Sequence, residues 1–356
     1  AKGAVLLGTK NLHDYTPRIP SRFEGVEMHC YSSLLNAGEL DSKSGANCRN
    51  IIIRGKGTIC GGGETLAKKI IEDERARIKS FTDDNPELAA SCETSDTLPG
   101  RVRPHLINLS NCENVWISGI TLKNSPSWNV HMIYCNDIQT DHCTFESEGI
   151  ENGDGWDPDS STNCTLFGCT FRTGDDAVAI KSGKNPEGNI IARPSAHIRI
   201  FDCSSECGHG VCIGSEMAGG VEDVQIWDCD LANSLYGLEI KATAKCGGYV
   251  RGVTVRDCTL PRVLLHSVTY NDDGAPAGAP PKFSHCFFER LTLTGAALDA
   301  QRNWQDVSPI EISGFEQAGH ATEDITFKDV VIKKPSATLS MELCRNVTLT
   351  NVSCGE

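Results

Sequence analysis

The sequence has little of what marks membrane or nucleic-acid-binding proteins. Its 356 residues contain no apolar run near the ~18 residues that a transmembrane helix needs. Its 33 lysines and arginines face 47 acidic residues, and the net charge of −14 argues against phosphate neutralisation. An acidic substrate stays compatible with this charge, because salt limits the reach of each charge to roughly 8 Å. We therefore expect no nucleic-acid partner and no membrane partner.

Targeting and disulfide signatures are also missing. The chain begins at Ala1 without an initiator Met, and it lacks the basic region and apolar stretch of a signal peptide, so its start does not indicate a compartment. The 18 cysteines include no Cys-x-x-Cys pair. Cys164 with Cys169, and Cys203 with Cys207, lie close in sequence, but no histidine cluster completes a metal site. Most cysteines are predicted to be buried as small apolar side chains, and no metal or other cofactor is expected.

From about residue 105 the sequence repeats itself. Each unit has a short run of alternating β-branched residues, then Asn, Asp or Gly, and then a second short run. The units cover 111–125, 135–147, 161–174, 195–208, 221–234, 249–262, 284–295, 322–335 and 343–354. Short strands at spacings of roughly 20 to 30 residues without helices between them predict an all-β, right-handed, single-stranded parallel β-helix in one domain over 1–356. A β-sandwich is the alternative, but few tight hairpin signals are present.

Two segments depart from the repeat. Residues 61–81 place apolar side chains at helical spacing among charges and predict an inserted amphipathic helix. Its apolar positions are Leu66, Ile70, Ile71, Ile78 and Phe81. The stretch from there to about residue 100 is expected to be a loop, as is 184–194, which is rich in Pro, Gly and Asn.

Three short groups occupy corresponding places in successive units. They are Asn152-Gly153-Asp154, Gly174-Asp175-Asp176 and Gly208-His209-Gly210. Equal offset along a β-helix repeat means equal position on the surface, so we expect Asp154 and Asp175 one above the other, roughly 5 Å apart, with Asp176 adjacent. Clustered carboxylates repel, which raises the pKa of one and leaves another ionised. Hydrolysis of a glycosidic bond needs that division between an acid and a base.

These groups resemble glycoside hydrolase family 28, the polygalacturonase family. Its signatures Asn-x-Asp, Gly-Asp-Asp, Gly-His-Gly and Arg-x-Lys appear in order as 152–154, 174–176, 208–210 and, altered, 239–241. The resemblance implies hydrolysis of α-1,4-galacturonosidic bonds in pectin, with inversion and without a metal. The pectic polysaccharide or oligogalacturonide would be the partner. The family resemblance implies a secreted or periplasmic protein, whereas many free cysteines would suit cytoplasmic action on oligosaccharides.

The resemblance also implies roles for individual residues. Asp175 would be the general acid, and Asp154 and Asp176 would hold the attacking water. His209 would keep Asp175 protonated, and Lys241 would bind a substrate carboxylate. Asn152 and Gly210 belong to the same motifs and are candidates for substrate binding, with a turn or an asparagine ladder as the structural alternative.

The fourth signature is altered, because Glu239 stands where the family has Arg. An acid replaces a bidentate carboxylate clamp, which leaves two interpretations open. Glu239 points away while an Arg from elsewhere substitutes, or the leaving sugar is not galacturonate, as in rhamnogalacturonan. Against the second, rhamnogalacturonan hydrolases tend to alter the Gly-Asp-Asp and Gly-His-Gly groups, and both are intact here.

Other candidates for substrate contact carry less weight, and each has a plain core or surface role as its alternative. Lys181 follows Asp176 by five residues, and Tyr270 resembles the family's sugar-stacking tyrosine. Further candidates to line the cleft lie in the two preceding coils. They are Trp128, Asn129 and His131, one coil before Asp154, and Arg101 and Arg103, one coil earlier again.

Competing functions remain at this stage. A pectate lyase shares the predicted fold and substrate but uses Ca²⁺, for which the three aspartates are candidate ligands. A non-catalytic carbohydrate-binding β-helix is a further alternative. Exo-acting enzymes close one end of the cleft with inserted segments, and 64–81 and 184–194 are expected to do so here. The chain also begins in what reads as a strand, so earlier coils are expected to be missing. Its oligomeric state is left open.

Overall fold

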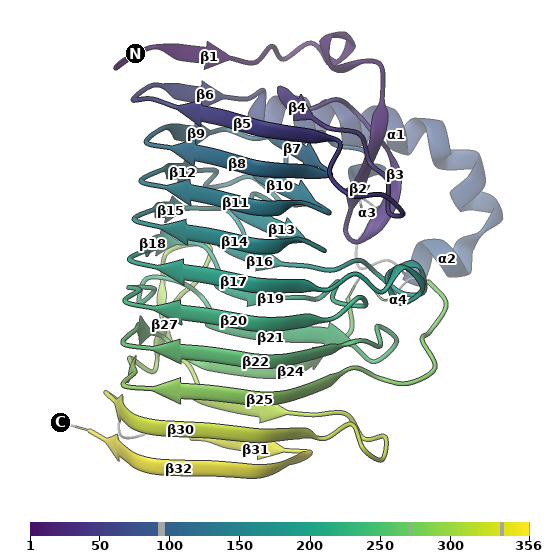
Figure 1. Cartoon of the computed structure of the whole chain (residues 1–356). Coiled ribbons are helices and arrows are strands. Elements are labelled where there is room, and N and C mark those ends of the chain that lie inside the picture. The colour runs from purple at the N-terminus through teal and green to yellow at the C-terminus, as the bar shows by residue number, and fades with distance from the viewer. Residues whose placement is uncertain (92–96, 271, 273, 335–337, 356) are drawn as a thin grey trace.

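The chain winds into stacked coils whose strands pair in parallel from one coil to the next (Figure 1). The computed structural model describes residues 1–356 except 92–96, 271, 273, 335–337 and 356. Three parallel sheets of six, ten and twelve strands run along the stack. The predicted parallel β-helix is therefore confirmed.

Each coil contributes a strand to two or three of these sheets. The six-stranded sheet contains β1 (Val5–Leu7), β6 (Thr58–Cys60), β9 (Thr121–Lys123), β12 (Thr144–Glu146), β15 (Thr170–Arg172) and β18 (Ser204–Cys207). The ten-stranded sheet contains β4 (Leu35–Ala37), β7 (Ile107–Ser110), β10 (Val130–Ile133), β13 (Trp156–Asp159), β16 (Val178–Ile180), β19 (Gly210–Ile213), β21 (Gly237–Thr243), β24 (Val263–Val268), β29 (Ile310–Ser313) and β31 (Ser340–Glu342). The twelve-stranded sheet contains β5 (Cys48–Arg54), β8 (Cys112–Ser118), β11 (Asn136–Asp141), β14 (Thr162–Phe167), β17 (Ser195–Phe201), β20 (Val221–Trp227), β22 (Tyr249–Arg256), β23 (Thr259–Leu260), β25 (Lys282–Glu289), β26 (Thr292–Leu293), β30 (Thr322–Ile332) and β32 (Cys344–Cys354). Two antiparallel hairpins stand outside the coils, β2 (Ile19–Phe23) with β3 (Val26–Cys30), and β27 (Ala296–Leu298) with β28 (Trp304–Asp306).

A sharp turn ends most of the long strands of the twelve-stranded sheet, and five of the seven turn residues are Gly or Asp. The residue after the strand has a positive φ in coil after coil, a conformation that Gly, Asn and Asp adopt most readily. These residues are Gly119, His142, Gly168, Asp202, Asp228, Asp257 and Arg290. The left-handed turn redirects the chain into the short strand that follows, which explains the spacing of the sequence repeat.

The cysteines fill the interior, as predicted. Seventeen cysteines are described, and all of them are free thiols. Five are buried in consecutive coils at the first position after the turn residue, where they stack with the other apolar side chains of the core. They are Cys143, Cys169, Cys203, Cys229 and Cys258. The thiol is small enough to fit a crowded turn and apolar enough to be buried there.

The predicted helix forms as α1 (Gly63–Asp84), but only its first half is buried. Leu66 and Ile70 are fully buried, whereas Ile78 is half-buried and Phe81 is exposed. The two expected loops are wrong in part. The first contains the short helices α2 (Pro86–Ser91) and α3 (Thr97–Gly100), with residues 92–96 outside the described part, and 184–194 contains α4 (Glu187–Ile191).

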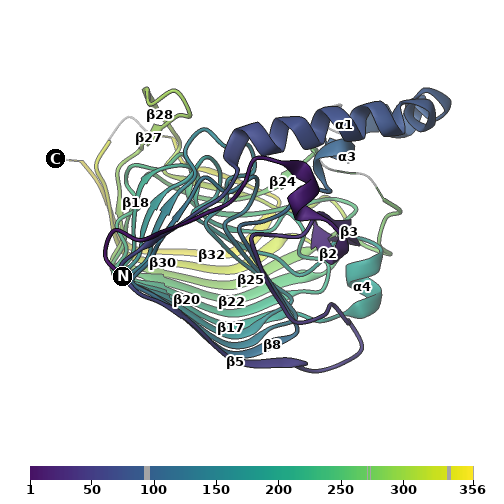
Figure 2. The same cartoon turned by 90° about the horizontal axis from the view of Figure 1, so that it is seen from above.

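The β2–β3 hairpin contacts the ten-stranded sheet, where Ser21 Oγ of β2 donates to Asn108 Oδ1 of β7 (2.8 Å). Figure 2 looks down the coils and shows the hairpin beside α4, with α1 along the outside. The backbone N–H of Lys184 donates to Gly25 O (2.9 Å), and the N–H of Glu27 donates to a carboxylate oxygen of Glu187 (3.0 Å). Leu66 and Ile70 of α1 pack with Tyr15 of a short 3₁₀ helix, η1 (Leu12–Tyr15), and with Tyr31, which follows β3. In the described residues, no helix has the length and apolar character to span a membrane.

Candidate active site

A pocket of about 280 Å³ lies on the outer side of the ten-stranded sheet. Its walls bring together residues from the hairpin, from five consecutive coils and from the segment after β24. They are Glu24, Trp128, Asn152, Asp154, Asp175, Asp176, Lys181, His209, Gly214, Ser215, Glu216, Tyr236, Lys241 and Tyr270. The pocket therefore contains the three predicted aspartates, the histidine, both predicted lysines and the predicted tyrosine.

Strand register places the pocket's key side chains in one column. Trp156 of β13 pairs with Val178 of β16, which pairs with Val211 of β19. Two residues back along each strand are Asp154, Asp176 and His209. The expectation that Asp154 and Asp175 lie one above the other is therefore wrong, because Asp154 is level with Asp176. Asp175 is the preceding residue and points to His209 from one position further back.

His209 carries the positive charge of this cluster. Its Nδ1 atom lies 2.8 Å from Asp175 Oδ1 and 3.4 Å from Asp176 Oδ1. Burial alone would lower the pKa of His209, but the charges of these two carboxylates raise it well above its usual value. Burial would raise the pKa of Asp175, but His209, Lys241 and Lys181 outweigh it and hold that pKa low. These pKa directions favour a proton on His209 rather than on Asp175 in the free protein, whereas the family resemblance implies that His209 keeps Asp175 protonated.

Asp154 and Asp157 form a second carboxyl group pair, and their pKa values are raised where that of Asp175 is lowered. Asp154 and Asp157 are both buried, and burial together with the neighbouring carboxylates raises the pKa of each well above its usual range. Asp157, on β13, is a residue that the sequence analysis missed. Among the described residues, neither of its carboxylate oxygens has a hydrogen-bond partner, and the same holds for Asp154 Oδ1 and Asp176 Oδ1. The site thus holds buried acceptors that are free to bind a water or a sugar hydroxyl.

Lys181 offsets part of this negative charge. Its Nζ atom lies 3.3 Å from Glu216 Oε2 and 3.7 Å from Asp154 Oδ2, and 4.7 Å from the centre of the Trp128 ring. Lys181 also pairs across the sheet with Asp159. The side chain of Lys181, a predicted candidate for substrate contact, therefore lies in the pocket wall beside Asp154.

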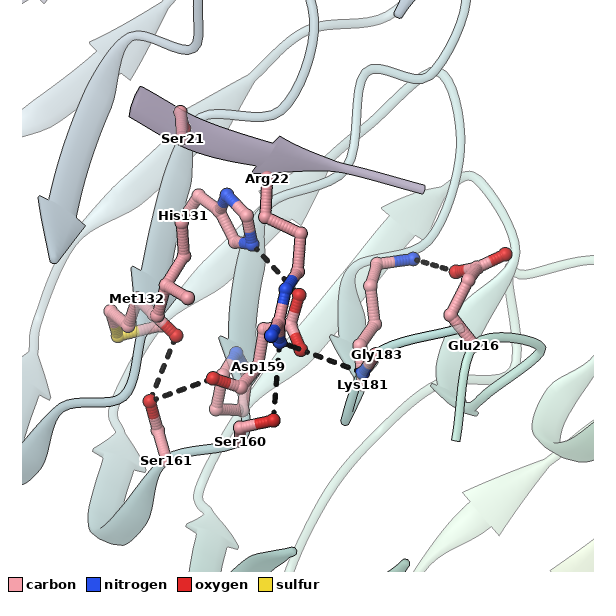
Figure 3. Close-up of polar contacts among 12 residues, drawn as sticks. Ser21, Arg22, His131, Met132, Asp159, Ser160, Ser161, Lys181, Gly183 and Glu216 are labelled. Carbon is pink, nitrogen blue, oxygen red and sulfur yellow. Dashed lines mark hydrogen bonds and ion pairs between the residues drawn. The ribbon is translucent and has the colours of Figure 1, made fainter. Parts of the chain in front are cut away.

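A buried ionic network ties the hairpin to these strands (Figure 3). Arg22 of β2 donates from Nη1 to Asp159 Oδ1 (2.7 Å) and to Ser160 Oγ (3.1 Å). His131 Nε2 lies 3.2 Å from the other oxygen of Asp159, and the N–H of Gly183 also reaches Asp159. Arg22 and its neighbouring charges hold the pKa of Asp159 at about 2 against the effect of burial. His131 therefore has a place in this network and does not line the pocket, contrary to its predicted substrate contact.

The altered fourth motif faces the pocket side of β21. Glu239 and Lys241 lie two residues apart and so share one face of the strand. Glu239 Oε2 is 2.9 Å from Lys241 Nζ, and Glu239 Oε1 is 2.7 Å from Nε2 of His266 on β24. Burial would raise the pKa of Glu239, but these cations lower it to about 2. The interpretation that Glu239 points away is wrong.

The remaining predicted residues support the pocket from behind. Arg103 donates to Asn152 Oδ1 (2.5 Å), and Arg101 pairs with Glu24 (2.6 Å). The side chain of Asn129 donates to the backbone oxygen of Asp154 (2.8 Å). Arg101, Arg103 and Asn129 do not line the pocket themselves. Gly210 is set by packing, because a Cβ there would lie 2.4 Å from the backbone oxygen of Gly237.

Five pocket residues were not predicted from the sequence: Glu24, Gly214, Ser215, Glu216 and Tyr236. Glu24 comes from the hairpin tip, and no local signal connects that segment to the coils. Glu216 follows the Gly-His-Gly motif by six residues, and Tyr236 is level with His209 because Gly210 pairs with Gly237. The offset that located Asp176 and His209 would have found Tyr236, whose ring lies 5.1 Å from the His209 ring.

The chain is similar to several known proteins. A probable polygalacturonase of Vitis vinifera is 40% identical over 161 residues, which is 44% of this chain and 33% of that protein. The exo-poly-alpha-D-galacturonosidase of Dickeya chrysanthemi is 25% identical over 383 residues, which is 99% of this chain and 62% of that protein. The crystal structure of an exopolygalacturonase from Thermotoga maritima superposes with a TM-score of 0.79 at 24% identity, over 99% of this chain and 78% of that one.

The chain therefore spans between a third and two thirds of the length of these two curated relatives. A sequence model described as Glycosyl hydrolases family 28 matches residues 22–354, nearly the whole of the chain. That match takes in all the motifs that meet in the pocket, and the chain belongs to glycosyl hydrolases family 28.

Proposed function

We propose that this protein hydrolyses α-1,4-galacturonosidic bonds of pectin, with inversion and from the chain end. The observation that carries the proposal is the column of Asp154, Asp176 and His209 with Asp175 beside it. It combines buried carboxylate oxygens that lack hydrogen-bond partners among the described residues with a carboxylate, Asp175, whose Oδ1 lies 2.8 Å from His209 Nδ1. Inverting hydrolysis needs these two functions on opposite sides of the scissile bond.

The proton inventory of the site fits this chemistry. A proton on His209 Nδ1 is 2.8 Å from Asp175 Oδ1, so Asp175 can pass it to the glycosidic oxygen as the bond to the anomeric carbon breaks. Asp154 Oδ1 and Asp176 Oδ1 accept the hydrogens of a water, whose oxygen forms the new bond to that carbon. The proton that the water releases stays on the carboxylate pair and later returns to the histidine through solvent.

A pectate lyase reaction is the competing proposal, and the charges of the site argue against its calcium. Two clusters of the described residues have the spacing of a metal site, Asp175 with Asp176 and His209, and Asp176 with Cys212 and Glu239. The first includes the protonated His209, and the second adjoins Lys241, which is paired with Glu239. In each cluster a cation already balances part of the negative charge, which weakens the attraction for a divalent cation.

Polygalacturonate incubated with the protein in excess chelator separates the two reactions. We expect reducing ends to accumulate at an undiminished rate, without the ultraviolet absorbance of an unsaturated product. Loss of activity in chelator, together with that absorbance when Ca²⁺ is restored, would contradict hydrolysis.

Chain-end action is supported by the wall that the hairpin builds. Glu24 stands at the hairpin tip and lines the pocket, with Arg101 paired to it at 2.6 Å. Neither α1 nor α4 contributes a pocket residue, so the two inserts expected to close the cleft instead support the hairpin. Monogalacturonate should therefore be the first product from homogalacturonan oligomers, with little early loss of polymer viscosity.

We expect Glu24 to hold the terminal sugar. Glu24→Gln keeps the shape of the side chain but removes the charge that strengthens a hydrogen bond to a sugar hydroxyl, so the KM for trigalacturonate should rise about tenfold. Steady-state kinetics measure this, with the exposed Glu316→Gln as the matched control. An unchanged KM would remove Glu24 from the substrate site.

A further inference from the structure

Lys241, which the family resemblance assigns to a substrate carboxylate, already has an ion-pair partner. Lys241 lies 2.9 Å from Glu239, and Glu239 also accepts from His266 (2.7 Å). A substrate carboxylate at Lys241 would therefore meet a carboxylate beside it. If the leaving sugar is an acid, a second cation must supply what the family's arginine supplies elsewhere.

Arg262 does not line the pocket itself, but it lies directly behind a side chain that does, the Tyr236 ring, at the edge of the site. It immediately precedes β24, and its backbone oxygen accepts from the N–H of Leu238 (3.3 Å), one coil from the altered motif. Its guanidinium carbon lies 4.9 Å from the centre of the Tyr236 ring, and that ring lies 5.1 Å from the ring of His209. His209, Tyr236 and Arg262 thus form a line over three consecutive coils, which continues outward from the proton donor.

Arg262 is also available for a ligand. Among the described residues it takes part in no ion pair, and its buried Nε has no hydrogen-bond partner. A buried donor without a partner is costly, and a carboxylate that accepts from Nε and a terminal nitrogen together would recover that cost. The stacked Tyr236 holds the guanidinium plane in place for such a two-point contact.

We propose that Arg262 is a specificity-determining residue that binds the carboxylate of the sugar on the leaving side. The proposal rests on the proposed hydrolase function and deepens it. The leaving sugar is then a uronate, and neutral leaving sugars such as the rhamnose of rhamnogalacturonan are poor substrates. The Arg262 guanidinium, which comes from the next coil, then takes the place of the arginine that β21 lacks.

The test compares three disaccharides: digalacturonate, galacturonosyl-galactose and galacturonosyl-rhamnose. The unmodified protein should prefer digalacturonate. Arg262→Met should lower kcat/KM for digalacturonate by about ten- to a hundredfold, mainly through KM, because a charge-assisted contact is lost. Its kcat/KM for the two neutral substrates should stay within about twofold, since they do not use that contact. Arg262→Lys should recover part of the preference, because it restores the charge without the planar fork.

Arg256→Met is the matched control, because Arg256 is exposed on the twelve-stranded sheet beside Trp227 and should leave all three rates unchanged. If Arg262→Met loses kcat/KM equally on acidic and neutral substrates, or does not lose it at all, the inference about Arg262 is overturned. The proposed hydrolase function still stands in that case if the unmodified protein acts on polygalacturonate. An unmodified protein that hydrolyses neither polygalacturonate nor any disaccharide would overturn both. Unfolding midpoints of the variants identify any loss that comes from misfolding.

Discussion

Asp175→Asn is expected to lower kcat on polygalacturonate by about 10²- to 10⁴-fold, the range that a general acid contributes. The amide keeps the volume of the side chain but cannot pass a proton from His209 to the leaving oxygen. The contact between His209 Nδ1 and Asp175 Oδ1 at 2.8 Å also loses its charge, so the raised pKa of His209 should fall. Reducing-end assays over a pH series measure both effects.

Asp202→Asn is the control for this substitution. Asp202 is an exposed turn residue with a φ of 51°, a conformation that asparagine also adopts readily, so activity and stability should not change. An Asp175→Asn variant that keeps a tenth or more of the activity would remove Asp175 from the role of acid. A non-catalytic β-helix predicts instead that the unmodified protein and both variants are equally inactive.

The repeat pattern predicted the fold because each coil satisfies the same local rules. Alternation buries residues such as Val115 and Ile117, and the turn residue after each strand is one that tolerates positive φ. The motif offsets likewise predicted that Asp154, Asp176 and His209 would meet in one region. The exact column was missed because the coils differ in length, and only the pairing of Trp156 with Val178 fixes which aspartate is level with which.

The pocket wall could not be predicted from the sequence. Arg22 contacts Asp159 across 137 residues, and the hairpin's own sequence carries no repeat that would place it against the coils. The prediction that the 61–81 helix closes the cleft was wrong for the same reason. Its amphipathic pattern indicates that one face is buried, but it does not indicate which surface covers that face. The interpretation that Glu239 points away overlooked that Glu239 and Lys241, two residues apart in one strand, share a face.

Arg22→Met is expected to lower the free energy of unfolding by about 3–5 kcal/mol, the cost of breaking a buried ion pair by removing one partner. Arg22 and Asp159 are both almost fully buried, so among the described residues the carboxylate left behind keeps hydrogen bonds only with His131 and the backbone N–H of Gly183 (Figure 3). Methionine fills much of the volume of the arginine stem, which confines the loss to the charge. Denaturant unfolding followed by circular dichroism measures the change, with Arg49→Met as the control. Arg49 forms an exposed pair with Glu113 (2.6 Å), so its loss should cost less than about 1 kcal/mol.

The pH dependence of the free energy of unfolding provides a second, independent test of the Arg22–Asp159 ion pair. Arg22 and His131 depress the folded pKa of Asp159 to about 2, below the ~3.9 of an unfolded aspartate. Asp159 therefore contributes stability that is complete above the unfolded pKa and is lost as the pH falls through it towards about 2. In Arg22→Met the folded pKa should rise, so the variant should lose less stability between pH 5 and about pH 2 than the unmodified protein does. Parallel stability curves for the two proteins over that range would show that the Arg22 contact carries no net charge stabilisation, and the hairpin would then be held by its packing on α1 and α4.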